Sequence, residues 1–173
     1  ATLGQMRVRP MQGGDDEWYF DPGSRSGKIA ALLDILRDIG EEKVVVYSPS
    51  KKFQVPLVAQ LEKAGYSCAR VDGEHKDDWK RFLDKDGPQI LCAVIPAGAE
   101  GVDGLQRVCR HEVWAGLDPS VVRCVQAQGR LHRTGQTGTV VRWLLQCPST
   151  VDTESVIPRL DQRYADLKVS GLI

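Results

Sequence analysis

The sequence predicts an α/β fold built around a mostly parallel central sheet, in a single lobe. Its 173 residues are about one domain long, and 42% hydrophobic and 27% charged residues are typical of globular proteins. Short β-branched runs alternate with stretches of helical periodicity, which is the pattern of βαβ units. The longest apolar run, residues 90–99, is too short to cross a bilayer, so no membrane partner is expected.

The expected elements follow in order along the chain. A helix with its N-cap at Ser26 ends at Gly40. Pro56 suits a first turn and Gly65 a C-cap, which predicts a second helix over residues 55–64. The remaining expectations are strands at 43–47, 66–71, 89–95, 112–114 and 138–146, helices at 76–83, 120–131 and 151–168, and a loop at 96–101.

Ligand sites in parallel sheets lie beyond the carboxyl ends of the strands. The loops after Tyr47, Val71 and Ile95 are therefore the first places to search. Residues 23–28 (GSRSGK) look like a phosphate loop, but the spacing is one residue short, no hydroxyl residue follows the lysine and no strand precedes it. The chain alone is not expected to hold a nucleoside triphosphate and its Mg²⁺ in the P-loop manner.

Charge and cysteine content limit the partners that we expect. Lys and Arg equal Asp and Glu at 23 each, but residues 104–142 hold six arginines against Glu112 and Asp118. Such a stretch is either a phosphate-binding face or a solvated surface. The five cysteines are odd in number and lack metal-ligand spacing, so we expect no disulfide and no structural metal.

The most informative segment is residues 126–136, QAQGRLHRTGQ. If one helix runs through it, Gln126, Arg130 and Arg133 share a face at i, i+4 and i+7. Two planar guanidinium groups suit the charge that develops on a transferring phosphoryl group. The alternative is a solvent-facing helix whose arginines pair with carboxylates.

This segment resembles motif VI of superfamily-2 helicases, and its ending resembles the Swi/Snf-type branch of DNA translocases, including those encoded by bacteria and phages. Other segments agree in the right order. Residues 26–28 resemble the stretch that leads into that family's second lobe, 43–50 resemble motif IV, 71–73 the strand and turn of the next motif, 97–105 motif V, and 151–160 the closing helix.

The resemblance implies the second RecA-like lobe, a three-layer domain over residues 26–173, with 1–25 as an extension from a missing first lobe. That first lobe would bind most of the ATP and its Mg²⁺ and be this lobe's partner. By resemblance, Arg130 and Arg133 are arginine fingers with Gln126 beside them, and Gly101 and Asp103 approach the ribose. Asp103 stands where Asn is commoner, and Ile95-Pro96 replaces a usual Ser/Thr-Arg pair, which weakens the case for a DNA contact there.

Strand-end positions favour phosphate contacts with double-stranded DNA for Ser48, Lys51, Asp72 and His75, although each could be an ordinary loop residue. The expected activity is that of a DNA-dependent ATPase or helicase, with the fragment alone inactive. Two alternatives remain, the second lobe of an RNA helicase and a non-catalytic nucleic-acid-binding module. The expected location is intracellular, and cytoplasmic if the source is bacterial or phage.

Overall fold

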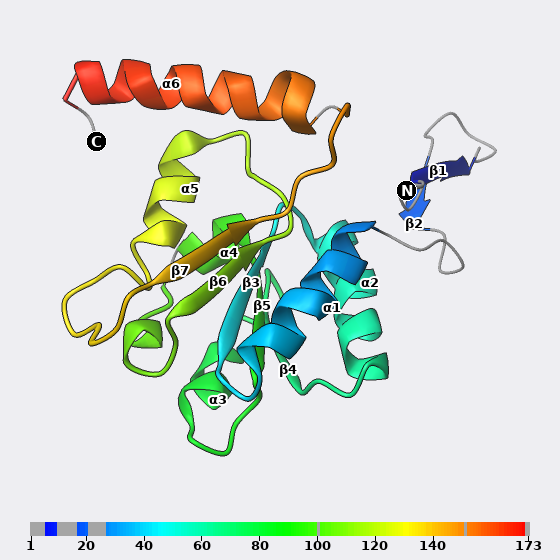
Figure 1. Ribbon diagram of the computed structural model, residues 1–173, viewed down its shortest axis with the longest axis vertical. Helices are drawn as coiled ribbons and strands as arrows, with labels where there is room; N and C mark the ends of the chain where they lie inside the picture. The colour runs from blue at the N-terminus through cyan, green and yellow to red at the C-terminus, as the bar shows by residue number, and fades with distance from the viewer. Residues whose placement is uncertain (1–5, 10–16, 21–26, 100, 151, 172–173) are drawn as a thin grey trace.

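A computed structural model describes residues 6–9, 17–20, 27–99, 101–150 and 152–171 (Figure 1). Its main sheet has five strands in the order β4-β5-β3-β6-β7, and every neighbouring pair is parallel. This confirms the α/β class that the alternating sequence pattern predicts. The strands are β3 (Val44–Ser48), β4 (Cys68–Val71), β5 (Ile90–Val94), β6 (His111–Trp114) and β7 (Val141–Leu144).

Helices cover both faces of this sheet. They are α1 (Gly27–Ile39), α2 (Lys51–Lys63), α3 (Trp79–Leu83), α4 (Ile95–Ala99), α5 (Val121–Gln128) and α6 (Ile157–Val169). A 3₁₀ turn (Leu105–Arg107) precedes β6, and a π-helix (Asp152–Val156) precedes α6. Among the described residues, no helix is both long and apolar enough to cross a membrane.

Two apolar cores lie on opposite faces of the sheet, because successive side chains of a strand point in opposite directions. Val44 and Val46 of β3 pack toward α1 and α2, and Val45 and Tyr47 pack toward α3, α4 and α5. All five residues of β3 and of β5 are buried, as expected of strands covered on both faces. The result is a three-layer domain.

Several of the predicted elements differ from the structure in their bounds or type. Helix α2 begins at Lys51, four residues before the expected start, because the Ser50 side chain accepts a hydrogen bond from the Phe53 N–H and Pro56 lies inside the helix. Residues 95–99, expected to form the end of a strand and a loop, form α4 instead. Helix α5 ends at Gln128, three residues early, and this shortening changes the candidate site.

The N-terminal region contains one described element that the sequence did not predict. Strands β1 (Met6–Arg9) and β2 (Glu17–Phe20) pair antiparallel as a separate hairpin. The expected N-cap at Ser26 lies outside the described residues. Among the tryptophans of the main domain, Trp114 is fully buried, and Trp79 and Trp143 are partly buried against the two cores.

Candidate functional site

The two arginines of the QAQGRLHRTGQ segment lie beyond α5, not on its face. The chain leaves the helix at Gly129, whose N–H still bonds the Val125 carbonyl. The Arg130 guanidinium then donates to the Val102 carbonyl oxygen at 2.8 Å, and Arg133 pairs with the Asp103 carboxylate at 2.7 Å. The prediction of one shared helix face is therefore wrong. Two adjacent residues of another segment hold the arginines instead.

This arginine segment, residues 130–133, lies toward the amino ends of the strands. Helix α5 must return the chain from the end of β6 to the start of β7, because these two strands are parallel. Just past the segment, the Gln136 side-chain amide donates to the Cys109 carbonyl at 2.9 Å, two residues before β6 begins. Figure 1 shows the yellow loop after α5 at the far end of the sheet from α6.

The two arginines differ in how accessible they are. Arg130 is partly buried, whereas the Arg133 side chain is 49% exposed. Arg133 also lines a cavity of about 520 Å³ with His132, Thr134, Gln136 and residues 138–140. An exposed guanidinium beside an open cavity can reach an anion that arrives from outside the lobe.

The other candidate residues of this region are also at the surface. Gln126 is exposed on α5. Gly101 adopts φ +70°, a left-handed conformation that glycine takes without strain. The Asp103 side chain is 67% exposed. Gln126, Gly101 and Asp103 are therefore accessible, and Asp103 is brought into direct contact with Arg133.

Helix α4 packs closely against the sheet next to this region. A Cβ atom at Gly98 would lie 3.0 Å from the Ala93 Cβ and 3.2 Å from the Tyr47 ring, so glycine lets the helix pack there. The buried Tyr47 hydroxyl donates to the Ala127 carbonyl at 3.0 Å and so fixes α5 on β3. Burial raises the pKa of Tyr47 far above its ordinary value, so the hydroxyl keeps its proton.

At the carboxyl edge of the sheet, Asp72 organises the loop that follows β4. This carboxylate is 1% exposed and accepts hydrogen bonds from the backbone N–H groups of Glu74 (2.8 Å) and His75 (3.0 Å). The Arg70 guanidinium and the His75 ring also contact it, at 3.0 Å each. Burial raises the pKa of Asp72, but the hydrogen bonds from Glu74 and His75 outweigh it and hold the pKa well below the ordinary range.

The remaining residues predicted at this edge differ in how exposed their side chains are. Lys51, at the start of α2, is exposed enough to meet a ligand and forms an ion pair with Glu74 at 2.5 Å. The His75 side chain is 42% exposed. Ser48 is fully buried, and its hydroxyl donates to the Ala93 carbonyl at 3.5 Å. The accessible residues of this edge are therefore Lys51 and His75.

No metal site was predicted, yet Asp72, Glu74 and His75 bring possible ligand atoms within 4.8 Å of one another. The Asp72 oxygens already accept hydrogen bonds from backbone and side chains. Two nearby cations, Arg70 and Lys51, pair with the same carboxylates. The carboxylates of this cluster therefore find their hydrogen-bond and ion-pair partners within the protein.

Two residues with strong contacts were missed by sequence reasoning. Gln54 is fully buried, and its amide donates to the carbonyls of Val71 (3.1 Å) and Cys92 (2.8 Å), which ties α2 to the ends of β4 and β5. Lys28 forms an ion pair with Asp152 at 2.6 Å and donates to the Ala115 carbonyl. The false phosphate loop thus ends in a lysine that connects α1 to the C-terminal segment.

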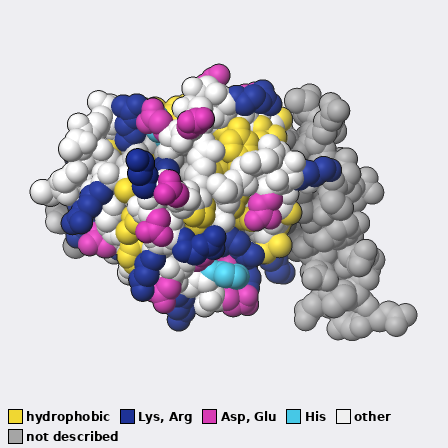
Figure 2. Space-filling view, turned by 90° about the horizontal axis from the view of Figure 1, so that it is seen from below, with side chains coloured by type: hydrophobic (Ala, Val, Ile, Leu, Met, Phe, Trp, Pro, Cys, Tyr) yellow, Lys and Arg dark blue, Asp and Glu magenta, His cyan; other side chains and the backbone are white. Residues whose placement is uncertain are grey.

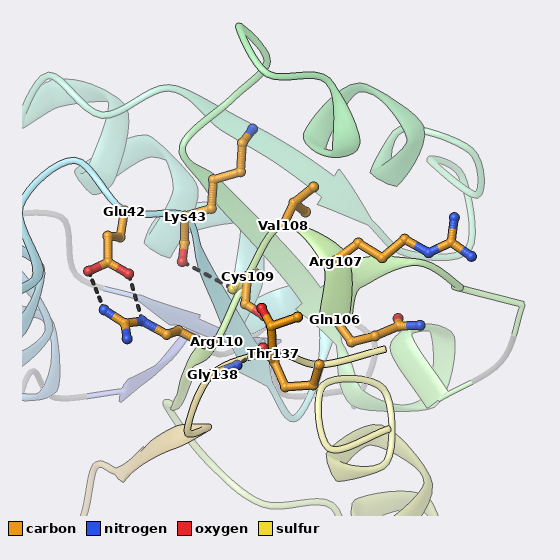
Figure 3. A pocket seen from close by; sticks show the side chains of 10 residues that line it. Glu42, Lys43, Gln106, Arg107, Val108, Cys109, Arg110, Thr137 and Gly138 are labelled. Carbon is orange, nitrogen blue, oxygen red and sulfur yellow. Dashed lines mark hydrogen bonds and ion pairs between the residues drawn. The ribbon is translucent and has the colours of Figure 1, made fainter. Parts of the chain in front are cut away.

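A second cavity, of about 430 Å³, lies at the amino edge of the sheet (Figure 3). At its border Arg110 donates two hydrogen bonds to Glu42, at 2.8 and 2.7 Å. These bonds lower the pKa of Glu42 to about 2, against an opposing effect of burial and with a smaller contribution from His111. The Cys109 thiol donates to the Lys43 carbonyl, and burial raises its pKa to about 12, so this thiol is not a ready nucleophile.

The arginine-rich stretch of residues 104–142 does not form a uniformly basic surface. Four of its six arginines pair with carboxylates: Arg110 with Glu42, Arg123 with Asp118, Arg133 with Asp103 and Arg142 with Glu112. On the face of the molecule seen in Figure 2, cationic and acidic side chains are interspersed. Of these carboxylates Glu112 is fully buried, and burial raises its pKa although Arg142 opposes that effect.

The matching family model is the helicase conserved C-terminal domain, and it spans residues 27–135, more than half of the chain. The chain belongs to this family. This match confirms the helicase C-terminal domain that the QAQGRLHRTGQ segment predicted.

The relatives of this helicase C-terminal domain are much longer proteins. It is 27% identical over 132 residues to an uncharacterized ATP-dependent helicase, YqhH, of Bacillus subtilis, with 75% of this chain and 23% of the relative covered. It is 29% identical over 126 residues to a putative SWI/SNF-related regulator of chromatin (subfamily A member 3-like 1) of Arabidopsis thaliana, covering 65% of this chain and 14% of the relative. The chain therefore spans less than a quarter of either protein.

The fold of this domain also matches a solved structure. The C-terminal part of the Fun30 ATPase domain aligns with a TM-score of 0.68 and 23% identity, over 80% of this chain and 45% of that one. The likeness confirms the RecA-like fold.

Proposed function

We propose that this domain is the second lobe of an ATP-dependent double-stranded DNA translocase. In this proposal Arg130 and Arg133 act as arginine fingers toward an ATP that a preceding lobe of the same polypeptide binds with Mg²⁺. The observation that carries it is the convergence of both arginines on Val102 and Asp103, with the Arg133 guanidinium half exposed over an open cavity. In the same proposal Gly101, Asp103 and Gln126, which are all exposed, face the nucleotide beside the arginines.

The chemistry required of this lobe is charge stabilisation. Bound ATP supplies the phosphoryl group. The residues that position the attacking water and bind the metal would lie elsewhere in the protein. Arg133 is suited to neutralise the charge that develops on the phosphate oxygens, because a guanidinium stays protonated and its fork binds two oxygens. The bond from Arg130 to the Val102 carbonyl orients the arginine segment before the phosphate arrives.

The nucleic-acid contacts are proposed at the carboxyl edge of the sheet. Lys51 and His75 supply accessible donors there, and Asp72 fixes the loop that presents them. Ser48 would act through this backbone framework, since its side chain is buried. Contacts of this kind bind phosphates, so they give salt-sensitive affinity without reading sequence.

The test is ATP hydrolysis by the full-length protein with and without duplex DNA. Arg133→Ala should lower the DNA-stimulated turnover by roughly 10³- to 10⁵-fold, as loss of an arginine finger does in related enzymes. Arg123→Ala is the matched control, because Arg123 is a similarly exposed arginine (51%) on α5 that pairs with Asp118. Equal turnover of the two variants would contradict the assignment of Arg133.

The same assay separates the alternatives. Stimulation by RNA and not by duplex DNA would identify an RNA helicase lobe. A binding module without catalysis would show no turnover, and Arg130→Ala would instead weaken DNA binding and reduce its salt dependence.

A further inference from the structure

Asp103 holds the more exposed of the two arginines through a charge-assisted hydrogen bond. Its Oδ1 lies 2.7 Å from Arg133 Nη1, and the two residues are 30 positions apart in the sequence. Both side chains face solvent, at 67% and 49% exposure. Arg130 differs, since it is partly buried and donates to a neutral backbone carbonyl that cannot move away independently of the fold.

An incoming phosphate and the Asp103 carboxylate compete for the same guanidinium. Both are oxyanions that accept hydrogen bonds from the arginine fork. The Arg133 guanidinium stays protonated, so it remains a partner for whichever anion binds it more strongly. The pair is exposed, so breaking it costs little, and a phosphate can displace the carboxylate. The displaced carboxylate still repels a nearby phosphate, however, and this repulsion weakens nucleotide binding.

Resting on the proposed function above, we propose that Asp103 is a positioning residue that restrains Arg133 away from the nucleotide and so weakens ATP binding. The restraint depends on the negative charge of Asp103. In the free protein it keeps the guanidinium turned toward residue 103. When ATP binds, Arg133 exchanges the carboxylate for phosphate oxygens, and no covalent bond changes.

The experiment compares Asp103→Asn with the wild type in the full-length protein. The probe is a fluorescent, non-hydrolysable ATP analogue with Mg²⁺, titrated at low salt, and kcat and KM for ATP are measured in parallel. Asp103→Asn should bind the analogue about two- to fivefold more tightly, which is the range of an exposed ion pair. The gain in kcat/KM should appear mainly in KM, and it should shrink toward zero at about 0.5 M salt because the pair is screened.

Two matched variants control for charge and shape. Asp103→Glu keeps the charge and should bind the analogue more weakly than Asp103→Asn does. Asp34→Asn removes an equally exposed carboxylate that pairs with Arg37 on α1, so it changes the net charge by the same amount far from the site. An Asp103→Asn protein that binds the analogue no better, or more weakly, overturns the inference, and weaker binding would favour a direct ribose contact. An equal gain in Asp34→Asn would assign the effect to net charge and overturn it too.

A second readout needs no nucleotide and so separates this inference from the proposed function. Phenylglyoxal modifies arginines, and peptide mass spectrometry measures the rate at each site. Release of Arg133 by Asp103→Asn should raise its modification rate about twofold or more, with Arg37 as the internal reference. An unchanged rate in a protein that hydrolyses ATP overturns the restraint and leaves the function intact. A raised rate in a protein without ATPase activity supports the restraint and contradicts the proposed function.

Discussion

The arginine segment and the Asp72 loop lie at opposite edges of the same sheet and are built in opposite ways. Arg133 stands half exposed on an irregular loop, where it forms an ion pair with Asp103. Asp72 is almost fully buried and accepts four hydrogen-bonded contacts from Arg70, Glu74 and His75. The first region leaves its charged group able to move, and the second fixes its charged group in place.

The difference follows from what each region is proposed to do. A group that meets a nucleotide held by another lobe must change partners during each cycle, so its contacts in the free lobe must be weak. A loop that tracks a nucleic-acid backbone needs a constant shape, and a buried carboxylate that binds two backbone N–H groups supplies one. Substitutions should therefore separate the regions, since one affects turnover and the other affects stability.

The largest expected effect on stability belongs to Asp72. Asp72→Ala should lower the free energy of unfolding by about 3 kcal/mol, because Arg70 and two backbone N–H groups lose a buried charged partner. Arg133→Ala should change it by less than about 0.5 kcal/mol, as expected of an exposed side chain. Urea unfolding followed by circular dichroism measures both. Similar losses in the two variants would remove the contrast between the regions.

The second prediction uses pH. The pKa of Asp72 is lower in the folded chain than its unfolded value of about 3.9. Its ionised form therefore stabilises the fold fully above that pH, and this stabilisation is lost as the pH falls toward the folded pKa. Between about pH 6 and pH 3, Asp72→Asn should lose less stability than the wild type. Urea midpoints at several pH values provide the measurement, and parallel curves would argue against this role of Asp72.

The smallest expected effect concerns Lys51. Lys51→Ala should weaken duplex-DNA binding a few-fold and reduce the slope of log affinity against log salt by about 1, as loss of one phosphate contact does. Lys63→Ala is the control, because Lys63 lies at the other end of α2. Fluorescence anisotropy at several salt concentrations tests both variants. Equal losses would mean that the carboxyl edge is not the DNA-facing edge.

Local patterns predicted much of the fold and the identity of the key residues. The runs at 43–47 and 89–95 became the buried strands β3 and β5, because only a sheet covered on both faces accommodates continuous apolar runs. The QAQGRLHRTGQ segment led to the helicase family that the comparisons confirm. Helix α4 was missed, since five residues that include Pro96 and Gly98 have little helical tendency of their own and depend on packing against Tyr47.

The sequence by itself determined the fold class, the family and the presence of two arginines suited to phosphate. Only the tertiary structure decided their partners. It shortened α5, placed Arg130 on the Val102 carbonyl and Arg133 on Asp103, and neutralised most of the arginine-rich stretch with carboxylates, two of which, Glu42 and Asp103, lie outside it. The physical reason is that periodicity and composition are local, whereas an ion pair depends on which segments the parallel sheet brings together.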